Sequence, residues 1–267
     1  MLISRRNILI PAASIALLPA FPLRAQAQIS SAVAINRSGR LRALSQRSAK
    51  LFAQTSLDVL AQSARDTMTA AKRLMQASLD DLAKASLTGA MASQLATVSQ
   101  NAASFTALLA STPNKDNLPR INASADRLLD EANKLTNMLE ANAKQGSAKL
   151  INTAGRQRML SQRLAKNYFL AAAGIETATT RAQLTDDRSE FKANLEALGA
   201  APISTPAIRN ELQLAHAQWM FFEASLNRKA DAESMKTVAT TSERLLEVSN
   251  NLAGHYETAL RDLLGST

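Results

Sequence analysis

Apolar side chains recur every three or four residues over most of the chain, and short stretches with glycine or proline interrupt this spacing. The period places apolar residues on one helix face, so the pattern predicts amphipathic α-helices joined by turns. In the first half they run from Ser31 into the sixties, to about Ala85, from Met91 to Ala110 and from Leu118 to Ala143. In the second half they begin near Ser147, Thr179, Thr205 and Ala230. We therefore predict an all-α fold.

The chain repeats itself at a spacing of about 116 residues. The segment INRSGRLRALSQRSAK, residues 35–50, returns as INTAGRQRMLSQRLAK, residues 151–166. In the same register Ser31, a helix N-cap candidate, falls on Ser147, Leu79 and Leu82 fall on Leu195 and Leu198, and Phe105 falls on Phe221. Near the ends, DRLLDEANKL from Asp126 meets ERLLEVSNNL from Glu243 with a slip of one residue. A duplication predicts two tandem up-down four-helix bundles, 28–145 and 146–267.

The joint between the two predicted bundles is the stretch Gln145-Gly146-Ser147. A helix stop followed by an N-cap there would fold the second bundle alongside the first, as a pseudo-dimer. A helix continuing through Gly146 would instead stack the bundles end to end. We favour the side-by-side form.

Residues 1–27 have the features of an export signal: a basic start, an apolar run from Ile8 to Leu18 and the small-residue pattern Ala25-Gln26-Ala27. Residues 4–9, SRRNIL, also match the twin-arginine export pattern, and a general secretory signal is the alternative. Pro11 and Pro19 break the apolar run short of a membrane span, which disfavours an uncleaved anchor. We expect a periplasmic protein that does not span the membrane after cleavage.

Composition narrows the function classes. Cleavage would remove three arginines and no acidic residue, so the formal charge would fall from +9 to +6. The chain has no cysteine, which excludes disulfides, thiolate zinc sites and covalent haem attachment. His216 and His255 are the only histidines and lie far apart, so we expect no metal site. No nucleophile, phosphate-loop or dinucleotide motif occurs, so we expect neither an enzyme nor a cofactor. Export and few aromatics argue against nucleic-acid binding.

The repeated segment has two helical faces. At about 100° per residue, Leu44 and Leu51 lie near Arg40 and can face a bundle core. Arg42 lies about 200° away from Arg40, beside Ile35, Gly39, Gln46 and Ala49. This second face is mostly small or polar.

Glycine within a helix costs roughly 0.5–1 kcal/mol relative to alanine, so Gly39 and Gly155 call for a packing or functional reason. We expect them to let a facing helix come close while Arg42 and Arg158 reach across the gap. Two converging guanidiniums repel each other unless an anion lies between them, and an oxyanion can accept forked hydrogen bonds from both. The ordinary alternative is that these arginines lie on solvated faces or pair with nearby carboxylates.

The pattern I-N-x-x-G-R-x-R-x-L-S-Q-R-x-A-K resembles the P-box of periplasmic nitrate/nitrite sensor kinases and, more closely, the PilJ-type domain named after the type IV pilus chemotaxis transducer. In those kinases the P-box helices of two subunits bind nitrate through an arginine three positions after the motif glycine. The resemblance implies ligand-binding roles in both copies for the arginines Arg42 and Arg158, the glycines Gly39 and Gly155, the asparagines Asn36 and Asn152, and the later arginines Arg47 and Arg163. The basic residue after the motif asparagine is Arg37 in one copy and Thr153 in the other.

The sequence thus predicts a soluble periplasmic protein that binds a small anion, nitrate or nitrite first, and signals to a membrane receptor, kinase or transporter. The alternative is a helical interaction module for type IV pilus or chemoreceptor assemblies that binds no small molecule. A further open point is the run Trp219-Met220-Phe221-Phe222. Core packing is its expected role, and a partner-binding surface is the alternative, since four consecutive residues cannot all face one core.

Overall fold

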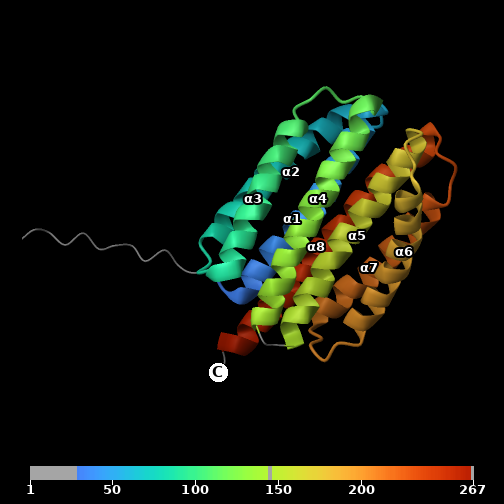
Figure 1. The fold of residues 1–267 in the computed structure, drawn as a ribbon. Helices are drawn as coiled ribbons and strands as arrows, with labels where there is room; N and C mark the ends of the chain where they lie inside the picture. Colours follow the sequence, from blue (N-terminus) through green and yellow to red (C-terminus); the bar gives the residue numbers. More distant parts are fainter. Residues whose placement is uncertain (1–28, 144–145, 266–267) are drawn as a thin grey trace, which may run out of the picture.

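The computed structural model describes residues 29–143 and 146–265, and within them the chain forms eight α-helices, one short 3₁₀ turn and no strand (Figure 1). The predicted all-α fold is confirmed. The helices are α1 (Ser31–Ser56), α2 (Ala61–Ala83), α3 (Gly89–Leu108), α4 (Leu118–Ala143), α5 (Gly146–Ala172), α6 (Ala178–Gly199), α7 (Pro206–Leu226) and α8 (Ala232–Gly265). None of these helices is long and apolar enough to cross a bilayer.

The helices pack as two sets of four. In the first set α1 packs against α2 and α4, and α3 packs against α4; α5 to α8 repeat this arrangement. The two sets lie side by side, with α1 packed along α5 (Figure 1). The predicted boundary between 145 and 146 falls next to residues 144–145, and the predicted leader covers 1–27; both segments lie outside the described residues.

The first helix is shorter than its apolar pattern predicts. It ends at Ser56 rather than in the sixties, and a turn follows in which Asp58 (φ 56°) and Leu60 (φ 49°) adopt left-handed conformations. At the position of Asp58 in the second copy stands Gly174, which has φ 78°. The sequence missed this turn because the first copy forms it without a glycine or proline.

The helix caps also differ from the prediction at the start of the first copy. The N-cap of α1 is Ser30, whose Oγ accepts a hydrogen bond of 3.3 Å from the Val33 amide, and Ser31 is the first helical residue. Later starts agree with the sequence within about two residues. Thr177 caps α6 and Thr205 caps α7.

The register of the repeat shifts between the second and third helices of each set. Leu79 and Leu82 are buried, as are Leu195 and Leu198, at the spacing of 116 residues. The connection 200–205 is one residue longer than the connection 84–88, so core residues beyond it correspond at 117. Phe105 therefore corresponds to buried Phe222, and its predicted match to Phe221 is wrong, because Phe221 is 65% exposed.

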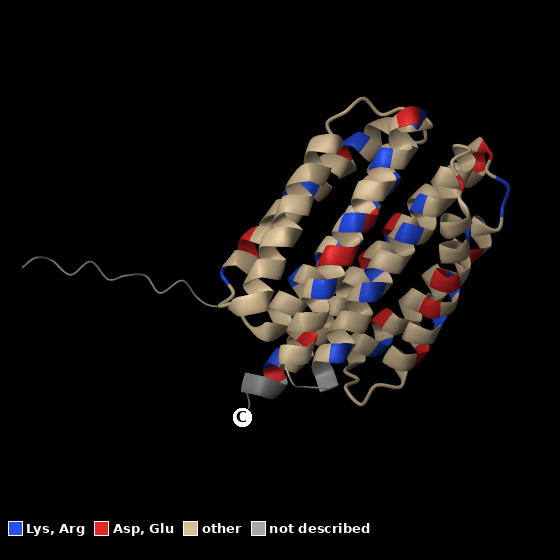
Figure 2. Cartoon of the chain, viewed as in Figure 1, with Lys and Arg blue, Asp and Glu red and all other residues tan. Residues whose placement is uncertain are grey.

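Acidic and basic residues are interspersed over both sets of helices in the view of Figure 2. The repeated helices α1 and α5 are exceptional because they lie between the sets and are buried on nearly all sides. Polar residues of the repeated segment are therefore enclosed in the middle of the protein. These enclosed polar residues make the α1–α5 contact the candidate functional site.

Candidate functional site

Two buried guanidiniums lie together between α1 and α5. Arg42 and Arg158 are each 1% exposed. A Cβ atom added at Gly39 would lie 3.1 Å from Arg42 Nη2 and 3.7 Å from Arg158 Nη2. One added at Gly155 would lie 3.0 Å from Arg158 Nη2 and 3.5 Å from Arg42 Nη2. The two glycines therefore leave the space that both side chains use.

Arg42 is held by asparagines from both sets of helices. Its Nη1 donates to Asn133 Oδ1 of α4 at 2.9 Å, and its Nη2 donates to Asn152 Oδ1 of α5 at 2.6 Å. Its Nε is buried without a hydrogen-bond partner. Among the described residues no carboxylate forms an ion pair with Arg42.

Arg158 repeats this arrangement from the other side. Its Nη2 donates to Asn36 Oδ1 of α1 at 2.7 Å, and its Nη1 donates to Asn250 Oδ1 of α8 at 3.4 Å. Its Nε is likewise buried and unpaired, and no ion pair joins it to a described carboxylate. Each arginine thus binds the motif asparagine of the other copy.

Two glutamates bind the asparagines on the side away from the arginines. Asn152 Nδ2 donates to Glu140 of α4, and Asn36 Nδ2 donates to Glu257 of α8. Each amide therefore accepts from an arginine with its oxygen and donates to a glutamate with its nitrogen. The glutamates fix the orientation of the amides, so that the oxygens face the guanidiniums.

The pKa of both arginines is lowered to about 9, and burial is the largest cause. For Arg42, repulsion from Arg156 contributes to this lowering, while Glu140 and Glu190 oppose it. For Arg158, repulsion from Arg40 and Arg42 adds to the effect of burial, and Glu257 opposes it. The site therefore holds two positive charges in a desolvated space, where an anion would stabilise them.

The later motif arginines do not join this cluster. Arg47 forms an ion pair with Glu243 of α8, and Arg163 donates from Nε to Asp187 of α6 at 2.8 Å. Arg37 pairs with Asp81 of α2 at 2.8 Å, so the difference between Arg37 and Thr153 also lies away from the two guanidiniums. Of the predicted site residues, the structure brings together the two asparagines, the two glycines and Arg42 with Arg158.

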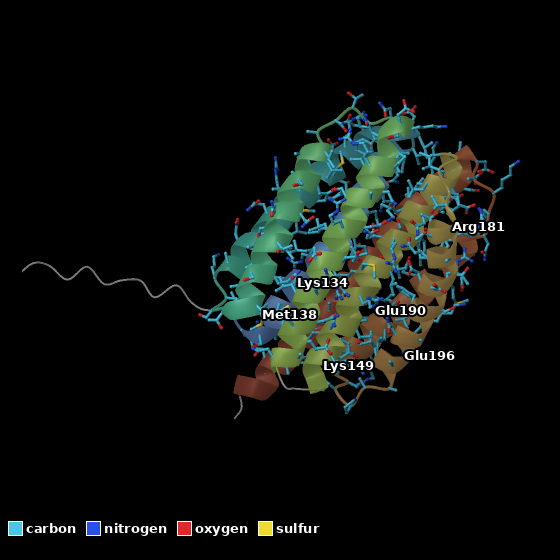
Figure 3. All side chains as sticks on the ribbon, in the orientation of Figure 1. Lys134, Met138, Lys149, Arg181, Glu190 and Glu196 are labelled. Atoms are coloured by element: carbon cyan, nitrogen blue, oxygen red, sulfur yellow. The ribbon has the colours of Figure 1, made fainter. Side chains whose placement is uncertain are left out.

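The neighbouring basic positions complete the electrostatic surroundings. Arg156 forms an ion pair with Glu190 of α6, which Figure 3 labels. Arg40 is the counterpart of Arg156, and both lie one residue past the motif glycine. These partly exposed side chains are positioned around the buried pair rather than within it.

Two buried lysines at the end of the motif escaped the sequence analysis. Lys50 Nζ donates to Gln162 Oε1 at 2.7 Å and contacts Glu243 of α8. Lys166 Nζ donates to Asp126 Oδ1 of α4 at 2.7 Å. Each lysine therefore ties its own set of helices to the last helix of the other set.

The partners Asn133 and Asn250 also escaped the sequence analysis. The sequence did mark them, because both asparagines occupy the same position in the repeated segments DRLLDEANKL and ERLLEVSNNL. Sequence alone could not show that they face the arginines, since that depends on how α4 and α8 pack. Recurrence of a polar residue within an apolar repeat was the available clue.

The aromatic run 219–222 is divided between the core and the surface. Trp219 and Phe222 are buried in the core, whereas Met220 and Phe221 are 71% and 65% exposed. In the described part of the chain, no group of three or more histidine, cysteine or acidic side chains is arranged to hold a metal ion.

Residues 141–245 match the family model described as the N-terminal region of the type IV pili methyl-accepting chemotaxis transducer, PilJ. The match covers α5, α6, α7 and the first part of α8, including the second copy of the motif. No curated protein and no solved structure matches the chain. The fold is a helical one, and its second half is similar to the N-terminal region of that chemotaxis transducer.

Proposed function

We propose that the chain is a periplasmic sensing protein that binds a small oxyanion, nitrate or nitrite first, between α1 and α5. One observation supports this proposal above all: Arg42 and Arg158 are buried side by side and lack a carboxylate partner among the described residues. Buried like charges raise the free energy of the folded state unless a counter-charge compensates them. A planar oxyanion would accept hydrogen bonds from both guanidiniums.

Binding would reach a partner through the relative position of the two helix sets. Since α1 and α5 belong to different sets, an anion bound by both arginines would favour the arrangement that holds these helices together. A small shift along this contact would change the surface that a membrane receptor, kinase or transporter recognises. The predicted leader supports the periplasmic location.

The second candidate is a helical interaction module of pilus or chemoreceptor assemblies that binds no small molecule. The bonds from both guanidiniums to asparagine oxygens favour it, because they hold the α1–α5 contact together without an anion. The glycines would then serve only the close approach of the helices.

Thermal unfolding in matched salts separates the two candidates. The protein without residues 1–27 is unfolded in nitrate, nitrite and chloride at equal ionic strength, and binding is measured by calorimetry. At a concentration 100-fold above the dissociation constant, the ligand adds about 2.7 kcal/mol to the stability of the folded state. The sensing proposal expects a larger rise in melting temperature with nitrate or nitrite than with chloride.

Substitutions of the two arginines test whether the nitrate-specific rise in melting temperature arises at this site. Arg42→Lys and Arg158→Lys keep the positive charge but lose the forked donors, so both are expected to lose the nitrate-specific rise. Arg181→Lys, at an exposed arginine of α6 paired with Glu176, is the control and should keep it. Equal responses to nitrate and chloride in the unaltered protein, or a full response in both lysine variants, would favour the interaction module.

A further inference from the structure

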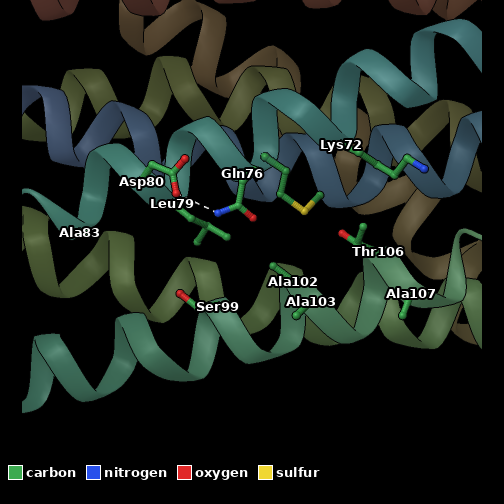
Figure 4. Close-up of a pocket in the computed structure, with 11 residues that line it drawn as sticks. Lys72, Gln76, Leu79, Asp80, Ala83, Ser99, Ala102, Ala103, Thr106 and Ala107 are labelled. Atoms are coloured by element: carbon green, nitrogen blue, oxygen red, sulfur yellow. Dashed lines mark hydrogen bonds between the residues drawn. The ribbon is translucent and has the colours of Figure 1, made fainter.

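A groove lies between α2 and α3, away from the two arginines. It has a volume of about 620 Å³, within the range of clefts that bind small molecules. Met75, Leu79 and Ala102 form its apolar floor, and all three are at most 9% exposed. Figure 4 shows Lys72 and Asp80 on α2, with Ser99 and Thr106 on the facing helix α3.

In the second set of helices, aromatic side chains fill the space between α6 and α7 that corresponds to the α2–α3 groove. At the positions of Met75 and Ala102 the second set carries Phe191 and Trp219, by the register established from the buried core. These rings stack with centroids 4.3 Å apart and an angle of 14° between their planes. An indole on a flat apolar surface therefore occupies, between α6 and α7, the place that is hollow between α2 and α3.

An ion pair joins α6 to α7 in the second set, and no such pair joins α2 to α3 at the edge of the groove. In the second set Lys192 of α6 and Glu223 of α7 form an ion pair of 2.6 Å across the two helices. Their counterparts are Gln76 and Thr106. Gln76 instead donates to Asp80 of its own helix at 2.8 Å, so this pair does not join α2 to α3.

One charge at the rim has no partner. Among the described residues Lys72 makes no ion pair and no hydrogen bond, and its side chain lines the groove (Figure 4). Asp80, farther along α2, already accepts a hydrogen bond from Gln76. A negatively charged group near the Lys72 end would meet an available ammonium group, while a flat ring rests on the floor.

We propose that the α2–α3 groove is a second ligand site, which binds a small aromatic carboxylate. The ring takes the place that the indole of Trp219 fills in the other set, and the carboxylate pairs with Lys72. This site does not depend on the anion site between α1 and α5, because none of its lining residues belongs to those helices.

Calorimetry and ligand-observed NMR with 1-naphthylacetate test the proposal, with neutral 1-naphthylacetamide as the comparison ligand. The unaltered protein should bind the acid more tightly than the amide. Ala102→Trp combined with Met75→Phe copies the filled arrangement of the second set and should weaken binding of both ligands at least tenfold. Ala96→Trp, at an exposed alanine of α3 outside the groove, is the control and should leave both affinities unchanged.

Lys72→Gln tests the charge without altering the core. It should weaken binding of the acid several-fold and leave the amide unchanged, and it serves alone if the filled variant does not fold. Absence of binding to the unaltered protein at millimolar ligand overturns the proposal. So does equal loss of acid and amide binding in Lys72→Gln, or unchanged binding in a folded double variant.

Discussion

Arg42 and Arg158 are the residues on which the candidate site depends, and asparagines rather than acids hold them. Amide oxygens accept hydrogen bonds from a guanidinium without neutralising it, so the positive charge persists after folding. Glu140 and Glu257 accept hydrogen bonds from Asn152 and Asn36 rather than from the arginines. At the scale of single residues, the site therefore combines Nη donors that have amide acceptors, Nε donors that have none, and charge that no ion pair compensates.

Asn152→Ala tests this arrangement directly. The substitution removes the 2.6 Å acceptor of Arg42 Nη2 and leaves it only the longer bond of 3.4 Å to the backbone oxygen of residue 152. A buried donor that loses its main partner costs about 1–3 kcal/mol. We expect the free energy of unfolding in urea to fall by that amount. Nitrate should also raise the melting temperature of the variant more than that of the unaltered protein, because the vacated space borders the guanidinium.

Asn36→Ala should behave in the same way through Arg158, to which Asn36 Oδ1 is bonded at 2.7 Å. The control is Asn210→Ala, at an exposed residue of α7, which should change stability by no more than about 0.5 kcal/mol. Stability equal to that of the control in both site variants would show that the asparagines do not hold the arginines.

At the scale of elements, most helices were predictable because apolar spacing, glycine and proline marked them. The end of α1 was not, because Asp58 and Leu60 form a left-handed turn there without such a marker. The second copy held the missing information, since Gly174 stands at the position of Asp58. The slip of one residue was visible in the sequence near the ends of the copies, but its place was not, because it depends on one extra residue in the loop 200–205.

Substitutions at the two corresponding left-handed positions, Asp58 and Gly174, should have opposite effects on stability. Left-handed conformation costs an L-residue roughly 1–2 kcal/mol, whereas glycine adopts it freely but loses more entropy on folding. Asp58→Gly should therefore raise the free energy of unfolding by about 0.5–1 kcal/mol. Gly174→Ala should lower it by about 1 kcal/mol, and since nothing lies within 4 Å of the added Cβ, backbone strain is the cause.

Urea unfolding monitored by circular dichroism measures both variants. Ala77→Gly, at an exposed position in the middle of α2, is the control for the cost of glycine itself and should be destabilising. A loss of stability in Asp58→Gly as large as in this control would show that Asp58 is not strained.

At the scale of the whole molecule, side chains that cross between the two sets of helices join them. Glu243 of α8 meets Lys50 and Arg47 of α1, and Asp126 of α4 meets Lys166 of α5. The sequence predicted the two sets and favoured their side-by-side packing. It could not predict these links, because each joins residues that the repeat places in different copies and only the packing of α1 along α5 brings them together.

Glu243 makes this joint sensitive to acid. Burial alone would raise its pKa, but the charge of Lys50 and the hydrogen bond from Arg47 outweigh burial and lower the pKa to about 2. Because the folded-state pKa lies below that of an exposed glutamate, the stabilisation is fully present above about pH 4.5. It is lost as the pH falls toward 2, where the folded protein also binds the proton.

Glu243→Gln should therefore cost about 2 kcal/mol at pH 7, less than the full pKa difference implies because the side chain is 31% exposed. The difference between the variant and the unaltered protein should shrink as the pH falls from 4.5 to 2, in urea unfolding at a series of pH values. Glu247→Gln, at an exposed glutamate of the same helix, should track the unaltered protein throughout. A difference for Glu243→Gln that does not change over this interval would mean that its carboxylate is not held by Lys50 and Arg47.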